Sequence, residues 1–410
     1  MSAPDAPDAP GAPSGPRPIW DRGDAIDAQM LSFTIGDDPT MDRRLVEHDI
    51  RGSLAHARGL VRVGLISGSD LAAIERGLGE LLAERRAGLW DVEDGDEDVH
   101  SAVERRLIAK VGDPGKKLHT ARSRNEQVAV DLRLWLRDAV DSTCALADEL
   151  GDALREFALR HKDAALPGYT HLRPAMPSTV RDWALAHGRA LVDDVASFAD
   201  VRRRIAECPL GSGAGYGLPV ELDRAFVAEE LDFDRPAEPV TAVQHGRGRA
   251  ELSYVTSLEA LALDIGKLAA DLWIYSSKEF GFVKLPVELT TGSSLMPQKR
   301  NPDLIELLRA HGRQVVCDRA ALLDVLRDLP SGYHRDFQLI KPPLFRAHDR
   351  VAAMLPLCTK LVQRLEFDSE AVARVLADPG LAATARTLEK VRQGVPFREA
   401  YREESRAGDS

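Results

Sequence analysis

Residues 251–277, ELSYVTSLEALALDIGKLAADLWIYSS, decide the fold of this chain. Apolar residues recur at intervals of three or four along the stretch, which is the period of one helix face. The members of this stripe are Val255, Leu258, Ala262, Ile265, Leu268 and Leu272. Leu261, Leu263 and Ile274 lie off the stripe, and a helix that is apolar on more than one side must be buried on more than one side. The stretch therefore predicts a helix inside a bundle.

Three further stretches predict long helices that complete this bundle. Residues 128–150, 180–205 and 302–326 have apolar residues at helical spacing, and no run of alternating strand residues intervenes. We therefore predict an all-α protein with a central long-helix bundle over residues 113–354. The apolar faces leave two possibilities open, a monomeric bundle and an assembly of several chains.

The segments outside the bundle are of three kinds. Shorter helical patterns predict a small helical domain over residues 19–112 and a shortened C-terminal helical domain over residues 355–410. Residues 1–18, MSAPDAPDAPGAPSGPRP, have almost nothing to bury and predict a disordered tail.

Composition excludes several classes of function. The net charge of -11 argues against a nucleic-acid surface. The four cysteines are far apart and without a CxxC pair, which indicates reduced thiols in a cytoplasmic protein. No apolar run reaches bilayer length and no signal-peptide pattern opens the chain, so we expect no membrane partner. No metal-ligand spacing occurs, so we expect no metal. GSGAGYG at residues 211–217 departs from the dinucleotide-binding pattern and predicts a turn.

Chemistry concentrates in residues 291–303, TGSSLMPQKRNPD. Asn301, Pro302 and Asp303 predict the N-cap and first positions of a helix, whose positive end would face the loop. A serine hydroxyl, Lys299 and this helix end would together favour a deprotonated serine or hold a carboxylate. The alternative from the residues alone is a mobile surface turn with an incidental lysine.

GSSLMPQKRNP closely resembles the signature loop of the aspartase/fumarase superfamily, in which a serine on a closing loop is the proton-abstracting base. Within that superfamily the chain resembles argininosuccinate lyases, which split argininosuccinate into arginine and fumarate. Five more blocks of the chain occur in the same order as in that family: DVHSAVERRL (98–107), GKKLHTARSRNEQV (115–128), PGYTHLRPAMP (167–177), KEFGFVKLP (278–286) and VPFREA (395–400). The resemblance implies a long-helix fold, no cofactor, a small-molecule substrate, and a homotetramer whose active sites each draw residues from three subunits.

The resemblance also implies catalytic roles. Ser293 matches the base, and Lys299 with Asn301 matches the groups that hold the carboxylate gaining charge. His171 matches a histidine that pairs with a glutamate, here Glu306, which would keep the imidazole charged as an acid. Taken alone, one histidine is more often a structural hydrogen-bond partner.

Other matches imply contacts with the substrate. Arg122, Ser123, Arg124 and Asn125 match the stretch that grips the succinyl carboxylates, although alone they could form a solvated basic turn. Further family positions are Thr170, Tyr333, Gln338 and Lys341. His100 also matches, and a core role is an equal alternative for it.

The chain departs from the family on the amine side of the site. Asp38 stands where argininosuccinate lyases usually have a serine, and Glu238 stands at their asparagine. His245 and Gly246 replace an Asp-Arg pair unless a slip puts Arg247 in that role. Further replacements are Arg173 and Met176 for two glutamines, and Leu339 and Ile340 for two acids.

These departures predict a fumarate-releasing lyase whose amine is not arginine, with Asp38 and Glu238 suited to a cationic amine end that lacks a carboxylate. One alternative is a genuine argininosuccinate lyase with a drifted pocket. A catalytically silent scaffold is the alternative from another class, and the full set of catalytic residues argues against it.

Overall fold

The computed structural model describes residues 26–408 of the 410-residue chain, so the predicted tail at 1–18 lies outside the described residues. The chain divides into two compact units. Unit 1 comprises the residues up to Ala139 with Asp200–Ser253 and Ala321–Phe345, and unit 2 comprises Val140–Ala199, Tyr254–Ala320 and the residues from Arg346 onward. The boundaries at 112 and 354 expected from the sequence stay predictions.

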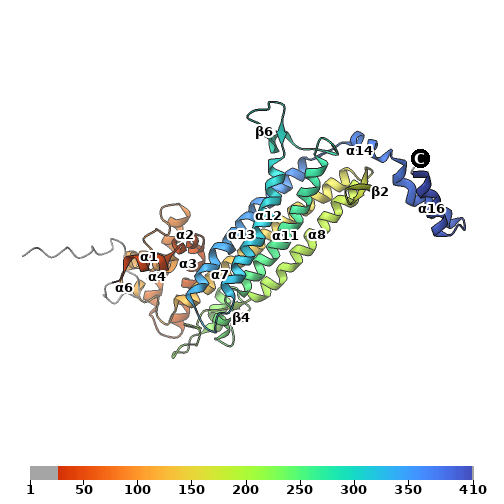
Figure 1. Cartoon of the computed structure of the whole chain (residues 1–410). Helices are drawn as coiled ribbons and strands as arrows, with labels where there is room; N and C mark the ends of the chain where they lie inside the picture. Colours follow the sequence, from red (N-terminus) through yellow and green to blue (C-terminus); the bar gives the residue numbers. More distant parts are fainter. Residues whose placement is uncertain (1–25, 409–410) are drawn as a thin grey trace, which may run out of the picture. The chain divides into compact units, whose positions relative to one another are not determined.

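Five long helices each contribute residues to both units. They are α7 (Arg124–Arg160), α8 (Val180–Arg204), α11 (Arg249–Tyr275), α12 (Asp303–Leu326) and α13 (Lys341–Arg364). The stretch at 251–277 is thus a helix, and α8 and α12 begin and end within one residue of the predicted limits. The prediction of an all-α protein built on long helices is confirmed, and these helices lie side by side in unit 2 (Figure 1).

The remaining elements of unit 1 are short. Its helices are α1 (Ala28–Ile35), α2 (Asp38–Asp42), α3 (Val46–Arg62), α4 (Gly68–Arg86), α5 (Val99–Val111), α6 (Asp113–Lys116), α9 (Arg224–Glu230) and α10 (Ala242–His245). The 3-10 helices are η1 (Arg43–Leu45) and η3 (Arg335–Ile340), and β3 (Glu207–Cys208) pairs in parallel with β4 (Arg235–Pro236). One hydrophobic cluster packs α3, α7 and α9 together through Ala55, Val130, Leu134, Val227 and Leu231.

Unit 2 adds hairpins and a short helical segment to the long helices. Its strands are β1 (Ala165–Thr170), β2 (Arg173–Thr179), β5 (Val283–Lys284), β6 (Thr291–Gly292), β7 (Arg300–Asn301) and β8 (Glu366–Phe367), which pair antiparallel as β1-β2, β5-β8 and β6-β7. Its shorter helices are η2 (Val287–Leu289), α14 (Ser369–Leu376), η4 (Pro379–Ala382), α15 (Ala383–Arg392) and α16 (Phe397–Gly408).

The core of unit 2 forms around α11. Val255, Leu258 and Ile265 are at most 1% exposed, and so is Leu261, which lies off the main stripe. A Cβ added at Gly312 of α12 would lie 2.8 Å from the carbonyl oxygen of Ala262, so only glycine lets the two helices approach this closely. Leu263, by contrast, is 50% exposed in the single chain.

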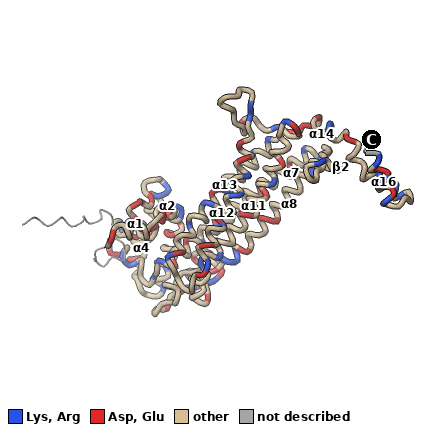
Figure 2. The backbone as a smooth tube through the Cα atoms, in the orientation of Figure 1, with Lys and Arg blue, Asp and Glu red and all other residues tan. Residues whose placement is uncertain are grey.

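Residues of both charge signs are distributed along the whole described chain. Lys and Arg are interspersed with Asp and Glu along the long helices and over unit 1 (Figure 2). Among residues 26–408, no helix is long and apolar enough to cross a membrane. Residues 211–217 form a turn, as predicted.

Candidate active site

The site residues expected from the sequence fall into two groups, one in each unit. Ser293, Lys299, Asn301 and Glu306 belong to unit 2 together with the Thr170-His171 pair. The second group belongs to unit 1 and consists of Asp38, Arg122, Ser123, Arg124, Asn125, Tyr333, Gln338 and Lys341.

The signature loop of unit 2 is the tip of a hairpin. β6 and β7 pair through Thr291 with Asn301 and Gly292 with Arg300, and residues 293–299 form an open loop between them. Oγ of Ser293 accepts hydrogen bonds from the backbone N–H groups of Met296, at 3.1 Å, and Leu295, at 3.4 Å. Two donors thus point at the oxygen that would lose its proton.

The prediction that Asn301 is the N-cap of a helix is wrong. Asn301 lies in β7, and α12 begins at Asp303. Nδ2 of Asn301 donates 3.2 Å to the carbonyl oxygen of Gly292 across the hairpin. The side chain therefore closes the loop that carries Ser293, because cross-strand pairing takes precedence over capping at this position.

His171 is held at the tip of another hairpin. From the sequence, Pro167-Gly168-Tyr169 predicts a turn that holds the imidazole at a helix start. That prediction is wrong, because these three residues lie in β1. The two-residue turn is His171-Leu172, and both residues have φ +55°, which is the type I′ geometry of a tight hairpin. Such left-handed backbone costs on the order of 1 kcal/mol per non-glycine residue. Despite this cost, the turn places the His171 imidazole at the tip of the hairpin.

Lys299, Asn301, Glu306 and His171 line two adjoining hollows of unit 2, whereas Ser293 lines neither. Lys299, Asn301 and Glu306 line one, and His171 lines the other with Tyr169. Leu172 lines both. Among the described residues, neither the His171 imidazole nor the Glu306 carboxylate has a hydrogen-bond or ion-pair partner, so their expected pairing stays a prediction.

In unit 1, Ser123 caps the start of α7. Oγ of Ser123 accepts 3.2 Å from the N–H of Asn125, and Oε1 of Glu126 accepts 3.2 Å from the N–H of Ser123. Oε2 of Glu126 also accepts 2.7 Å from the N–H of Gly213, which holds the 211–217 turn. Ser123 is thus engaged at a helix start, while its neighbours Arg124 and Asn125 line a cavity.

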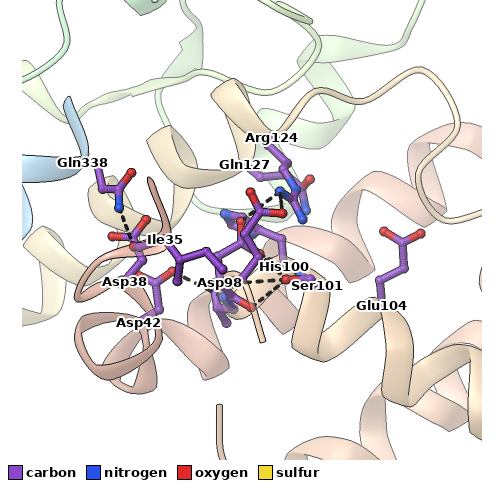
Figure 3. A network of polar contacts seen from close by, with 12 residues as sticks. Ile35, Asp38, Asp42, Asp98, His100, Ser101, Glu104, Arg124, Gln127 and Gln338 are labelled. Carbon is purple, nitrogen blue, oxygen red and sulfur yellow. Dashed lines mark hydrogen bonds and ion pairs between the residues drawn. The ribbon is translucent and has the colours of Figure 1, made fainter. Parts of the chain in front are cut away.

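This cavity of unit 1 has a volume of about 200 Å³ and is lined by charged groups of both signs. Nη1 of Arg124 lies 2.8 Å from Glu97 and 3.4 Å from Asp98 (Figure 3). Burial raises the pKa of Asp98, but His100, Arg124 and Ser101 outweigh it and lower that pKa to about 2. Neither Glu97 nor Asp98 was predicted as a site residue from the sequence; Asp98 opens the DVHSAVERRL block, and Glu97 directly precedes it.

Lys341 is neutralised by two acids. Its Nζ lies 3.1 Å from Oδ1 of Asp38 and 2.7 Å from Oδ1 of Asp42. Burial raises the pKa of Asp38 to about 6, although Lys341 lowers it. Burial lowers the pKa of Lys341, but Asp42 and Asp38 outweigh it, so that pKa is raised. Asp38, which stands where the family usually has a serine, is therefore ion-paired with Lys341.

Of three further residues expected to contact the substrate, Gln338 and Arg122 already donate hydrogen bonds within the chain. Nε2 of Gln338 donates to the carbonyl oxygens of Thr34, at 3.1 Å, and Ile35, at 2.6 Å (Figure 3). Tyr333 lines the cavity without a described hydrogen bond. Arg122 lies in the interior, 9% exposed, and donates 2.9 Å to Oγ of Ser53, so its role toward a substrate stays a prediction.

A buried cluster beside the cavity raises the question of a metal. One ligand atom each from Asp49, His100 and Asp131 lies within 4.8 Å of the others. Nδ1 of His100 is 2.8 Å from Asp49 and 3.6 Å from Asp131. Burial lowers the pKa of His100, but these carboxylates and Asp98 raise it to about 9. The raised pKa and the 2.8 Å contact of Nδ1 with Asp49 favour an ion-paired imidazolium over a metal ligand.

The amine-side residues do not form the expected cation pocket. The Glu238 side chain is 76% exposed, lies 3.5 Å from Arg224, and is not among the residues that line the cavity. Asp38 lines it but is paired with Lys341. Arg247, which the sequence left undecided, lines it as well.

Comparisons with known proteins agree with this architecture. A family model described as "Lyase" matches residues 23–317. Argininosuccinate lyase of Sorangium cellulosum is 44% identical over 94% of this chain and 89% of its own, and that of Thermotoga neapolitana is 40% identical over 94% and 96%.

Solved structures show the same fold. An EDDS lyase variant with bound fumarate has a TM-score of 0.79 at 22% identity, covering 93% of this chain and 76% of its own. A class II fumarase from Schistosoma mansoni has a TM-score of 0.75 at 17% identity, covering 94% and 92%. From its motifs, its fold and these relatives, this chain belongs to the argininosuccinate lyase family of the aspartase/fumarase superfamily and is a carbon–nitrogen lyase of the fumarate-releasing type.

Proposed function

We propose that this chain releases fumarate from an N-succinyl amine or amidine, with Ser293 as the base. The observation that carries the proposal is the pair of backbone N–H groups that donate to Oγ of Ser293. Hydrogen bonds to the deprotonated form of a group favour that form. The open loop would complete the effect by closing over the substrate, since loss of water strengthens each of these interactions.

The carboxylate next to the reacting carbon gains charge as the proton leaves. Groups aimed at this charge stabilise the transition state. Lys299 and Asn301 line one hollow with Pro302 and Asp303 at the start of α12, and a helix N-terminus carries positive partial charge. These groups suit the carboxylate that becomes an aci-carboxylate.

The leaving nitrogen needs a proton. His171 is the candidate acid, because the strained hairpin turn presents its ring at an exposed tip. Glu306 would orient the ring and keep it charged. Thr170, the last residue of β1, lies beside it for the fumarate half.

The identity of the amine has two candidate answers. The pairing of Asp38 with Lys341 favours an N-succinyl compound other than argininosuccinate, because it changes the charge of the family's substrate-binding lysine. The relatives at 40–44% identity are named argininosuccinate lyase, and they favour the alternative of a genuine argininosuccinate lyase.

We further propose a homotetramer whose active sites combine residues of several chains. Two observations support it. The long helices leave large apolar side chains half-exposed, among them Leu263 at 50% and Leu307 at 55%. Among the described residues of one chain, His171 and Glu306 do not contact each other, as expected if different subunits supply the two side chains.

One assay separates these possibilities. Purified protein is incubated with argininosuccinate and with other N-succinyl amines, and fumarate is followed by its absorbance. A kcat/KM on argininosuccinate of about 10⁴ M⁻¹s⁻¹ or above identifies a genuine argininosuccinate lyase. A far lower value with efficient release from another compound supports the specialised lyase, and no fumarate from any compound overturns the proposed function.

A further inference from the structure

The second residue of the His171-Leu172 turn is a leucine in an unfavourable backbone conformation. Leu172 has φ +55°, and the turn connects Thr170 and Arg173, which are paired across the β1-β2 hairpin. Turns of this type favour glycine, asparagine or aspartate at both central positions, because other side chains clash with the backbone at positive φ. Asparagine would therefore form the same turn at a lower cost than leucine.

The side chain of Leu172 is also exposed. It is 67% exposed in the single chain, so it contributes little to the core of unit 2. One exposed leucine is ordinary on a protein surface, but at this position the backbone itself disfavours the residue. A side chain that neither suits its turn nor packs into a core indicates a function outside the hairpin.

Leu172 belongs to an apolar wall between the two hollows of unit 2. Three residues line both hollows, and all three are apolar: Leu172, Ile274 and Phe280. The Phe280 ring is held by two other rings, whose centres lie 5.4 Å away for Phe282 and 5.5 Å away for Tyr169. Ile274 belongs to α11. The wall thus has two members anchored in the body of the unit and one, Leu172, at the tip of the hairpin.

This wall separates the imidazole from the hollow beside the signature loop. His171 and Asp271 line one hollow, Lys299 and Glu306 line the other, and residues 294–299 of the loop are exposed. A substrate bound beside His171 displaces water on its own side, so the second hollow is the remaining source of water. Water weakens the electrostatic interactions that assist a proton transfer. An apolar wall at this boundary keeps that water from the imidazole.

We propose that Leu172 is a positioning residue that keeps water from His171 while the imidazole protonates the leaving nitrogen. This rests on the proposed lyase function. In that step the electron pair of the C–N bond leaves with the nitrogen, which takes its proton from His171, and fumarate forms. In the competing step the carbon that lost its proton to Ser293 regains one, and the C–N bond stays intact. A hydrated and less effective acid leaves more time for the competing step.

The two steps are compared in one experiment. Argininosuccinate is incubated with the protein in D₂O, fumarate release is followed by absorbance, and deuterium in the recovered argininosuccinate is measured by NMR. Deuterium enters when the Ser293 hydroxyl exchanges with the solvent before it returns a proton to the carbon. For Leu172→Asn we expect kcat for fumarate release to fall on the order of tenfold, and the ratio of deuterium uptake to fumarate release to rise by a similar factor. If another N-succinyl amine is cleaved faster, it replaces argininosuccinate as the probe.

Asparagine suits the turn, so Leu172→Asn should not weaken the fold. Its urea midpoint should equal or exceed that of the unmodified protein, and its mass by light scattering should be unchanged. Leu172→Met keeps an apolar side chain and should restore most of the release rate and the low exchange ratio. Leu159→Asn is the matched control, because Leu159 of unit 2 is 63% exposed and lines neither hollow. The control should leave both steps unaffected.

An unchanged exchange ratio in Leu172→Asn overturns the proposal, whether or not the release rate falls, because a general loss of structure slows both steps together. A lower urea midpoint or a lower mass overturns it as well, since the leucine would then serve the fold or a subunit contact. Failure of the lyase function is distinguishable from both. The unmodified protein would then release no fumarate from argininosuccinate or from any other N-succinyl amine.

Discussion

Oδ1 of Asp38 lies 3.1 Å from Nζ of Lys341, although the two residues are 303 positions apart in the chain. Asp42 contacts the same ammonium at 2.7 Å, so one cation serves two acids. Such an excess of negative charge disfavours an anionic group of the substrate at this lysine.

Asp38→Ser should therefore improve the use of argininosuccinate. Without the Asp38 carboxylate, only Asp42 offsets the charge of Lys341. The ammonium group can then attract an anionic group of the substrate. We expect kcat/KM on argininosuccinate to rise on the order of tenfold, measured by fumarate absorbance. Asp37→Ser, an exposed neighbour, is the control and should change little. An unchanged or lower value for Asp38→Ser would show that Asp38 does not restrict the substrate.

Ser293→Ala should remove nearly all turnover and leave the fold intact. The hydroxyl belongs to an open hairpin loop and carries little packing, whereas the proposed proton abstraction depends on it entirely. Ser294→Ala is the matched control in the adjacent exposed position. A Ser293→Ala enzyme that keeps a large share of the rate would exclude this residue as the base.

His171→Asn should lower kcat by roughly 10² to 10⁴-fold, the usual loss when a positioned acid is removed. Glu306→Gln should lower it as well, because the carboxylate would orient the imidazole for proton transfer. His161→Asn replaces a histidine that lines neither hollow of unit 2 and serves as control. An unchanged rate for Glu306→Gln would mean that the two side chains do not act as a pair.

The apolar faces of unit 2 predict a tetramer in solution. Light scattering at micromolar concentration should give four times the chain mass, because Leu263 and Leu307 are too exposed in a single chain for a helix core. Leu263→Asp should reduce the mass, whereas Leu89→Asp, at a residue of unit 1 that is 74% exposed, should not. A monomer mass for the unmodified protein would contradict the shared active site.

Because the Glu126 carboxyl group is buried, we expect the folded protein to lose stability between acid and neutral pH. Burial raises its pKa to about 7 from an ordinary 4.5, against the backbone donors of Ser123 and Gly213. The folded state then binds more protons than the unfolded state between these values, so stability falls as pH rises from about 4.5 to 7. The loss from this group is about 3 kcal/mol at most.

Urea unfolding at pH 5 and pH 8 measures the effect. Glu126→Gln cannot ionise, so its stability should fall less between the two pH values than that of the unmodified protein. Glu229→Gln, at an exposed position, should keep the full loss. Equal losses in all three proteins would mean that Glu126 titrates normally.

The sequence by itself determined the long helices and the family. α8 and α12 begin and end within one residue of their predicted limits, because helical periodicity is a local property that many residues repeat. Five ordered blocks and the signature loop likewise identify the family. The resemblance then marks Ser293 and His171 within them, and Lys341 outside them, as candidates for the site.

Only the tertiary structure decided the geometry of the site. Pro167, Gly168 and Tyr169 predict a turn from their residue types, yet pairing between β1 and β2 places them in a strand and His171 at the tip of a hairpin. Asn301 closes a hairpin and does not cap α12. The Asp38–Lys341 pair depends on side chains brought together from distant segments. Such electrostatic partners follow from three-dimensional proximity and burial, which no local pattern of residues records.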